Sequence, residues 1–123
     1  MLRKLFAVAF AIACLAGLPA YADTVQNFDC SGTIAVGGTA QNLSLSTNEK
    51  KGFQIQNLDT TEPLWINFNT TAVANTAGSY ALAAATSTSL QNGGSYYSPV
   101  AFITSISVVA ATGGHKFSCT YWR

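Results

Sequence analysis

Apolar and polar residues alternate in short runs along most of the chain after residue 32, and helical periodicity is weak. Short alternating runs separated by clusters of Gly, Asn, Ser and Pro are typical of β-strands. The pattern predicts seven or eight strands, depending on whether the short run 79–82 is one of them. The expected strands are 33–36, 41–46, 53–57, 64–68, 79–82, 95–97, 103–109 and 116–122.

Two of these runs indicate which side chains face the core. In 53–57, the aromatic and aliphatic side chains point to one face and both glutamines to the other, as in a strand with one face in water. In 64–68, the same alternation places Trp65 beside Asn67, opposite the three other apolar residues. We therefore expect Trp65 to be exposed.

Turn signals separate the runs at intervals of about 8–12 residues, the spacing of a sandwich or small barrel. Residues 69–78 are small and polar and are expected to form a long surface connection. Short connections make neighbouring strands antiparallel, so 103–109 and 116–122 are expected to form a closing pair. The predicted fold is all-β, either a small antiparallel β-sandwich or a jelly-roll-like barrel. Gly-Gly turn pairs stand at 37–38, 93–94 and 113–114.

The N-terminal segment has the order of a secretory signal peptide. Two basic residues precede 18 uncharged residues, 5–22, which end in the small-x-small sequence Ala20-Tyr21-Ala22 that signal peptidase requires. We therefore expect residues 1–22 to be removed and residues 23–123 to form a single exported β domain. Its location would be the periplasm, the cell surface or the medium.

The apolar N-terminal stretch has two alternative interpretations. A retained membrane anchor would need about 20 apolar residues, and Gly17 and Pro19 interrupt this stretch. A lipoprotein would be acylated at Cys14, but the apolar run continues beyond Cys14, whereas a lipidated cysteine normally ends the hydrophobic region. Cleavage after residue 22 leaves a mature protein without a membrane span.

The mature chain has 101 residues, enough for one domain, with four basic and five acidic side chains. With so few basic side chains, the domain lacks the positively charged surface that nucleic acid binds. It also argues against a basic helix lying on a membrane surface. Its many Ser, Thr, Asn and Gln residues hydrate the surface without creating a strong field.

Two cysteines, Cys30 and Cys119, remain after the expected cleavage. An even number of cysteines in an oxidising compartment favours a disulfide, and two separate thiols are the alternative. The bridge would close a loop of about 90 residues and stabilise the fold by about 4–5 kcal/mol in the chain-entropy model.

No group of residues has the pattern of an active site or a metal site. His115 is the only histidine; it follows an expected Gly-Gly turn, where a solvated histidine is ordinary, and no serine lies in a GxSxG elbow. Asp59 and Glu62 flank another expected turn and should be solvated. Zinc and calcium would need denser sets of ligands. We therefore expect a protein that is not an enzyme and needs no cofactor.

The aromatic residues are the best candidates for a binding site. The set Trp65, Tyr96, Tyr97, Tyr121 and Trp122 is too large to be buried completely in a 101-residue domain. Exposed rings among neutral polar side chains can stack on sugar rings or anchor a protein interface. We take Trp65, Tyr96 and Tyr97 as the candidate binding or interface residues; a place in the core is the alternative.

Four segments carry a resemblance to a known group of proteins: KGFQIQN at 51–57, LWINF at 64–68, GGSY at 93–96 and ISVVAATGGHKF at 106–117. Together they resemble a small β-module that recurs in bacteriophage and prophage genomes, among virion-associated head and tail accessory proteins. The resemblance implies a non-enzymatic, β-sandwich-like subunit that assembles with its own copies or with a larger particle.

The export signal and the cysteine pair depart from that group, because most virion parts assemble in the cytoplasm. The module would then serve a cell envelope, or a virus whose subunits cross the inner membrane. Two functions follow. The first is a secreted structural or interaction subunit of a surface layer, filament or particle, since low charge leaves little repulsion between like subunits. The alternative is a carbohydrate- or ligand-binding module that uses the exposed aromatic residues.

Overall fold

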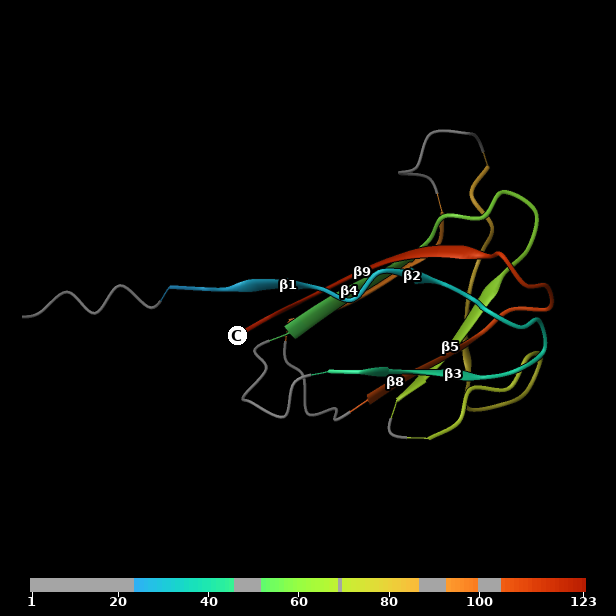
Figure 1. Ribbon diagram of the computed structural model, residues 1–123, viewed down its shortest axis with the longest axis horizontal. Helices are drawn as coiled ribbons and strands as arrows, with labels where there is room; N and C mark the ends of the chain where they lie inside the picture. The colour runs from blue at the N-terminus through green and yellow to red at the C-terminus, as the bar shows by residue number, and fades with distance from the viewer. Residues whose placement is uncertain (1–23, 46–51, 69, 87–92, 100–104) are drawn as a thin grey trace, which may run out of the picture.

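The protein folds into two antiparallel β-sheets that pack face to face (Figure 1). The computed structural model describes residues 24–45, 52–68, 70–86, 93–99 and 105–123, so the predicted signal peptide, 1–22, lies outside the described residues. These ranges contain nine strands and no helix. The prediction of a small antiparallel β-sandwich is therefore confirmed. The strands are β1 (Asn27–Asp29), β2 (Gly32–Thr33), β3 (Gln41–Ser44), β4 (Gly52–Asn57), β5 (Leu64–Phe68), β6 (Tyr80–Leu82), β7 (Ser95–Ser98), β8 (Ser105–Val109) and β9 (Lys116–Trp122).

The first sheet, sheet A, has the order β1-β9-β4-β7, and β2 pairs with the same edge of β9 as β1. The second sheet, sheet B, has the order β3-β8-β5-β6. The expected closing pair of 103–109 and 116–122 is wrong, because β8 lies in sheet B and β9 in sheet A. The turn between them carries the chain across the sandwich instead of closing a hairpin.

The core lies between the sheets and follows the alternation of the strands. In β4, Phe53 and Ile55 are buried while Gln54 is exposed, as predicted. In β9, Phe117, Cys119 and Tyr121 point inward and the residues between them point to the outer face of sheet A. The other buried side chains of this core are Ile34, Leu45, Leu64, Ile66, Leu82, Ile106, Val108 and Ala110.

One side of the sandwich, where the edge strands β6 and β7 face each other, is closed by aromatic side chains. Tyr80 of β6 and Tyr96 of β7 have ring centroids 5.3 Å apart, and Phe68 packs against both. The backbone N–H of Gly94 also donates to Ala83 O at 2.9 Å. On the other side, the chain leaves β2 and crosses to β3 in the second sheet. In place of the expected strand 33–36, the structure therefore has the shorter strand β2, which ends at Thr33.

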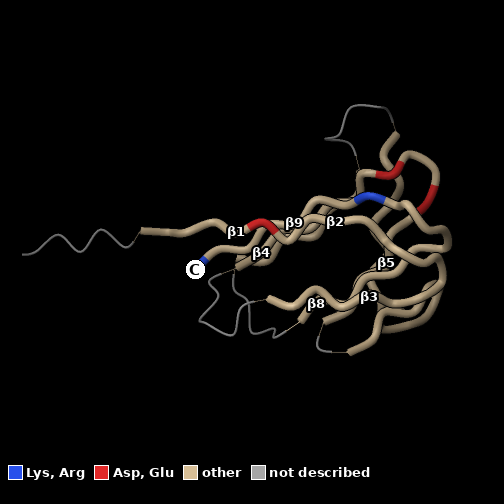
Figure 2. Tube along the Cα trace, in the orientation of Figure 1, with Lys and Arg blue, Asp and Glu red and all other residues tan. Residues whose placement is uncertain are grey.

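Charged residues are sparse over the described part of the chain (Figure 2). Three of the five, Asp59, Glu62 and Lys116, come from the segment after β4 and the start of β9. The other two are Asp29, at the end of β1, and Arg123, after β9. The strands β3 to β8 themselves therefore carry no charged side chain, and the two charges between them, Asp59 and Glu62, lie in the connection from β4 to β5.

Candidate functional site

Trp65 lies on the outer face of sheet B, as its phase predicts, but it is only 7% exposed. The segment 70–79 packs over this face, and Trp65 forms a second apolar cluster with Ala72 and Val109. The backbone N–H of Ala72 donates to Ser107 Oγ at 2.9 Å, which fastens the segment to β8. The expectation that Trp65 is exposed is therefore wrong, because the connection covers it.

Tyr96 is half-buried and faces the side of the sandwich rather than open solvent. Its ring centroid lies 4.9 Å from that of Phe68 and 5.6 Å from that of Phe53. Contacts of this kind between rings stabilise the packing beyond the apolar area that they bury. Tyr96 therefore closes the gap between the edge strands.

Tyr97 is the candidate that the structure leaves open, with 60% of its surface exposed. Its ring stacks against Trp122 with centroids 5.6 Å apart and an interplanar angle of 26°. The two residues come from β7 and β9, which pair with opposite edges of β4, so both rings lie on the outer face of sheet A. We call Tyr97 and Trp122 the aromatic pair.

A glycine beneath the aromatic pair lets the rings approach the sheet. Gly52 is paired with Trp122 across the β4–β9 ladder. A Cβ at Gly52 would lie 2.5 Å from Cζ2 of the indole, closer than side chains tolerate. The alternation of β9 is the signal that could have placed Trp122 on the face opposite Phe117 and Cys119, but the pairing of β4 with both β7 and β9 has no local signal.

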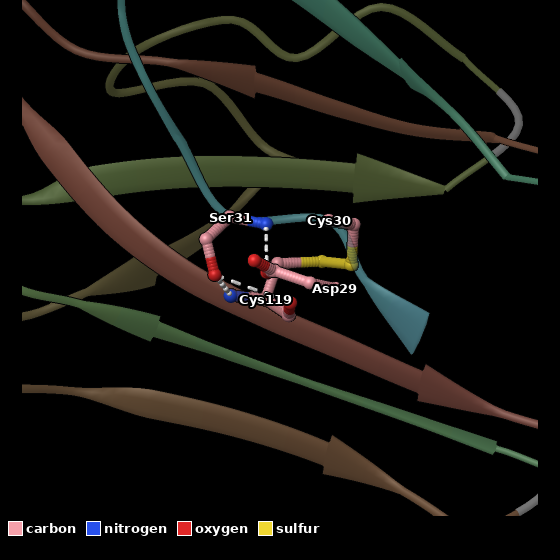
Figure 3. The surroundings of a disulfide bond; sticks show 4 residues. All are labelled: Asp29, Cys30, Ser31 and Cys119. Carbon is pink, nitrogen blue, oxygen red and sulfur yellow. Dashed lines mark hydrogen bonds between the residues drawn. A yellow bond between two sulfur atoms is a disulfide. The ribbon is translucent and has the colours of Figure 1, made fainter. Parts of the chain in front are cut away.

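The two cysteines form the predicted disulfide (Figure 3). Cys30 lies between β1 and β2, directly opposite Cys119 on β9, with their Cα atoms 4.7 Å apart. Ser31 Oγ accepts from the backbone N–H of Cys119 at 2.9 Å, and the Ser31 N–H donates to Asp29 Oδ1 at 2.8 Å. Hydrogen bonding from the Ser31 side chain, and from the Ser31 N–H, lowers the pKa of the Asp29 carboxyl. The bridge joins neighbouring strands of sheet A and leaves sheet B free of it.

His115 is buried, with 1% of its surface exposed, so the expectation of a solvated turn histidine is wrong. Its Nε2 lies 2.9 Å from Asn57 Oδ1. The Asn57 Nδ2 group is within 2.8–3.1 Å of three backbone carbonyls, those of Glu62, Leu82 and Ala83. These acceptors need the amide nitrogen as a donor, so Oδ1 is the acceptor and His115 Nε2 carries the hydrogen.

The other ring nitrogen of His115 faces a carboxylate. Nδ1 has no hydrogen-bond partner among the described residues and lies 3.9 Å from Asp59 Oδ2. Burial lowers the pKa of His115, and the nearby Asp59 and Glu62 carboxylates oppose that effect. The pKa of Asp59 is itself lowered, chiefly by the hydroxyl of Thr61, which donates to its Oδ1. Burial therefore favours the neutral form of the His115 ring.

This polar cluster links loops that are far apart in the sequence. Glu62 Oε2 accepts from the N–H and the hydroxyl of Thr112, at 3.1 and 3.0 Å, and so connects the turn after β4 to the turn after β8. Asp59 and Glu62 are half-buried rather than freely solvated. Because His115 is buried and its Nε2 is held by Asn57, the cluster holds these loops together.

Within the described ranges, no group of three or more His, Cys, Asp or Glu side chains is arranged to hold a metal ion. The same residues include no helix long and apolar enough to cross a membrane. Comparison of the chain with protein-family models, with curated proteins and with solved structures finds no match.

Proposed function

We propose that this protein is an exported, non-catalytic subunit that associates with its own copies in a surface layer, filament or particle. The observation that carries the proposal is the edge strand β3 of sheet B. Among the described strands, β3 pairs only with β8. Its outer edge is therefore available to extend the sheet into a neighbouring subunit.

The side chains of β3 do little to prevent such pairing. Edge strands of monomeric proteins are usually protected by charges, prolines or bulges. Gln41, Asn42, Leu43 and Ser44 include none of the protective residue types, and Asn42 and Ser44 are exposed. An added strand would gain backbone hydrogen bonds, as in other cases of strand addition between chains.

Low charge and the disulfide are compatible with this role. The described strands from β3 to β8 carry no charged side chain, so like subunits repel one another little. The Cys30–Cys119 bridge is compatible with an oxidising, exported compartment. The signal peptide at 1–22 and the resemblance to phage accessory subunits stay predictions; the first fits a subunit that assembles after export, and the second fits assembly with like copies.

The test is the oligomeric state of the oxidised mature chain, residues 23–123, measured by sedimentation velocity over a range of concentrations. We expect the wild type to form oligomers. The double variant Asn42→Lys/Ser44→Lys should shift towards monomer, because two like charges on each facing edge repel. A matched control, Thr71→Lys/Ala77→Lys, adds the same charge at exposed positions of the 70–79 segment and should assemble like the wild type.

Two results would contradict the proposal. A wild type that stays monomeric at high concentration would show that the protein does not associate with its own copies. Equal dissociation of both double-lysine variants would show that net charge, and not the β3 edge, controls association. Circular dichroism on each variant confirms that the sandwich is folded before its oligomeric state is compared.

A further inference from the structure

We propose that the aromatic pair, Tyr97 and Trp122, is a stacking platform for a neutral saccharide on the outer face of sheet A. This inference is independent of assembly through β3, since the platform lies on the other sheet. The ring faces of a saccharide carry C–H groups that pack on aromatic rings, while its hydroxyls need polar partners around those rings.

The aromatic pair has the geometry for ring stacking. The two rings lie within 26° of parallel, and the Tyr97 side of the pair is open to solvent, with 60% of the residue exposed. Gly52 lets the indole approach the backbone of β4. The rings are thus held on three paired strands rather than on a loop, and little ordering is needed when a ligand stacks on them.

Neutral hydrogen-bonding side chains adjoin the rings. Gln54 is the register partner of Tyr97 on β7 and of Thr120 on β9, so it lies between the two strands that carry the aromatic pair. Gln54 and Thr120 are both exposed. An amide and a hydroxyl supply the donors and acceptors that sugar hydroxyls require.

Charge favours a neutral ligand. Among the described strands of sheet A, the charged residues are Lys116, at the opposite end of β9 from Trp122, and Asp29 of β1, the register partner of Thr120. A polyanion would need several basic side chains beside its charges. An acidic polysaccharide or a nucleic acid therefore fits this face less well than a neutral sugar chain.

The small area of the aromatic pair favours a sugar over a protein partner. A stable protein interface buries about 800 Å² on each partner, whereas a large aromatic side chain contributes about 150–250 Å². Two partly covered rings fall well short of an interface core. Elsewhere in the described chain the exposed large apolar residues lie outside β4, β7 and β9, so they do not extend the patch. They are Val25, Val36, Val73 and Tyr80.

The experiment is isothermal titration of the oxidised mature protein with cellohexaose, N-acetylglucosamine hexamer, xylohexaose and mannohexaose, with an oligoguluronate as the anionic comparison. We expect the wild type to bind at least one neutral hexasaccharide. Tyr97→Ala and Trp122→Ala should each weaken that binding by about tenfold or more, the usual cost of removing an aromatic anchor. Tyr97→Phe keeps the ring and should bind within a few-fold of the wild type.

Tyr80→Ala is the matched control, because Tyr80 is an aromatic residue of similar exposure (50%) on sheet B; its binding should be unchanged. Acrylamide quenching gives a second readout that does not need a variant. Trp65 is buried, so acrylamide should quench mainly the fluorescence of Trp122. A sugar stacked on the aromatic pair should reduce this quenching.

Three results would overturn the proposal. They are no binding of the wild type to any neutral hexasaccharide, unchanged binding by Tyr97→Ala and Trp122→Ala, and binding of the anionic oligosaccharide alone. If Trp122→Ala does not fold, the exposed Tyr97→Ala variant and the quenching of the wild type still decide. The Asn42→Lys/Ser44→Lys variant should retain sugar binding even where its assembly is lost, so the two proposals can fail separately.

Discussion

Replacing Asn57 with alanine should cost this fold more stability than any other single polar substitution in the described chain. Asn57 is fully buried at the end of β4. Its amide group hydrogen-bonds three backbone carbonyls, and its oxygen accepts from the N–H of Asp59 and from His115. Asn57→Ala removes the amide group that makes all of these hydrogen bonds. The carbonyls, the Asp59 N–H and the His115 ring are then left without this partner.

The size of the effect follows from the number of groups left unpaired. Each lost hydrogen bond to a buried partner costs about 1 kcal/mol, and two amide hydrogens shared by three carbonyls count as fewer than three full bonds. The five contacts together predict a loss of about 3–5 kcal/mol. Since domains of this size are stable by about 5–15 kcal/mol, the variant should be close to unfolding at room temperature.

Urea titration followed by tryptophan fluorescence measures this loss, with the disulfide intact and the pH held at about 7.5. This pH is above the ordinary pKa of histidine, and burial lowers the pKa of His115 further. For a slope of about 1–2 kcal/mol per molar urea, the midpoint should fall by roughly 1.5–5 M. Gln54→Ala is the control, because Gln54 carries the same amide group on the exposed face of β4; its cost should be below about 0.5 kcal/mol. A loss of under about 1 kcal/mol for Asn57→Ala would refute the reasoning, since the buried partners would then find other hydrogen bonds.

Three further predictions concern the same fold. Because burial lowers the pKa of His115, the unfolded chain takes up this proton more readily, so stability should fall as the pH drops below about 6.5. Urea midpoints at several pH values measure this, and His115→Gln should flatten the profile near that pH; an unchanged slope would contradict it. Cys30→Ser/Cys119→Ser should lower the free energy of unfolding by about 4 kcal/mol for a loop of this length, and adding reductant should then leave the variant's midpoint unchanged. Trp65→Ala should cost about 3–5 kcal/mol as a buried large-to-small change, whereas Tyr97→Ala should cost below about 0.5 kcal/mol; comparable melting temperatures for the two would contradict the burial pattern.

Local alternation was sufficient to predict the positions of strands β3 to β9, whereas β1 was not predicted and β2 spans Gly32–Thr33 rather than 33–36. The period of two in 53–57 places Phe53 and Ile55 in the core, and β4 has that arrangement. The even number of cysteines left in the expected mature chain predicted the bridge between Cys30 and Cys119, which the structure contains. Each of these features depends on residues close in sequence or on a simple count, which is why the sequence was enough.

Features that depend on distant pairing could not be predicted in this way. Strand β9 pairs with β4 and with β1 rather than with β8, its neighbour in sequence. The burial of His115 depends on Asn57, 58 residues earlier in the chain. A Gly-Gly pair predicts a turn, but it does not specify whether the chain returns along the same sheet or crosses to the other.

Trp65 and Trp122 show why the phase of a strand predicts a face but not its exposure. Both indoles lie on outer faces, as alternation requires. Trp65 is covered because a connection of small residues, with Ala72 at its centre, can lie flat on sheet B. Trp122 is less covered and stacks on the exposed ring of Tyr97. The outer faces of the two sheets therefore differ: one is covered by its own chain around Trp65, and the other presents an aromatic ring to solvent. This asymmetry is the reason to look for a ligand on sheet A and for subunit contacts at the edge of sheet B.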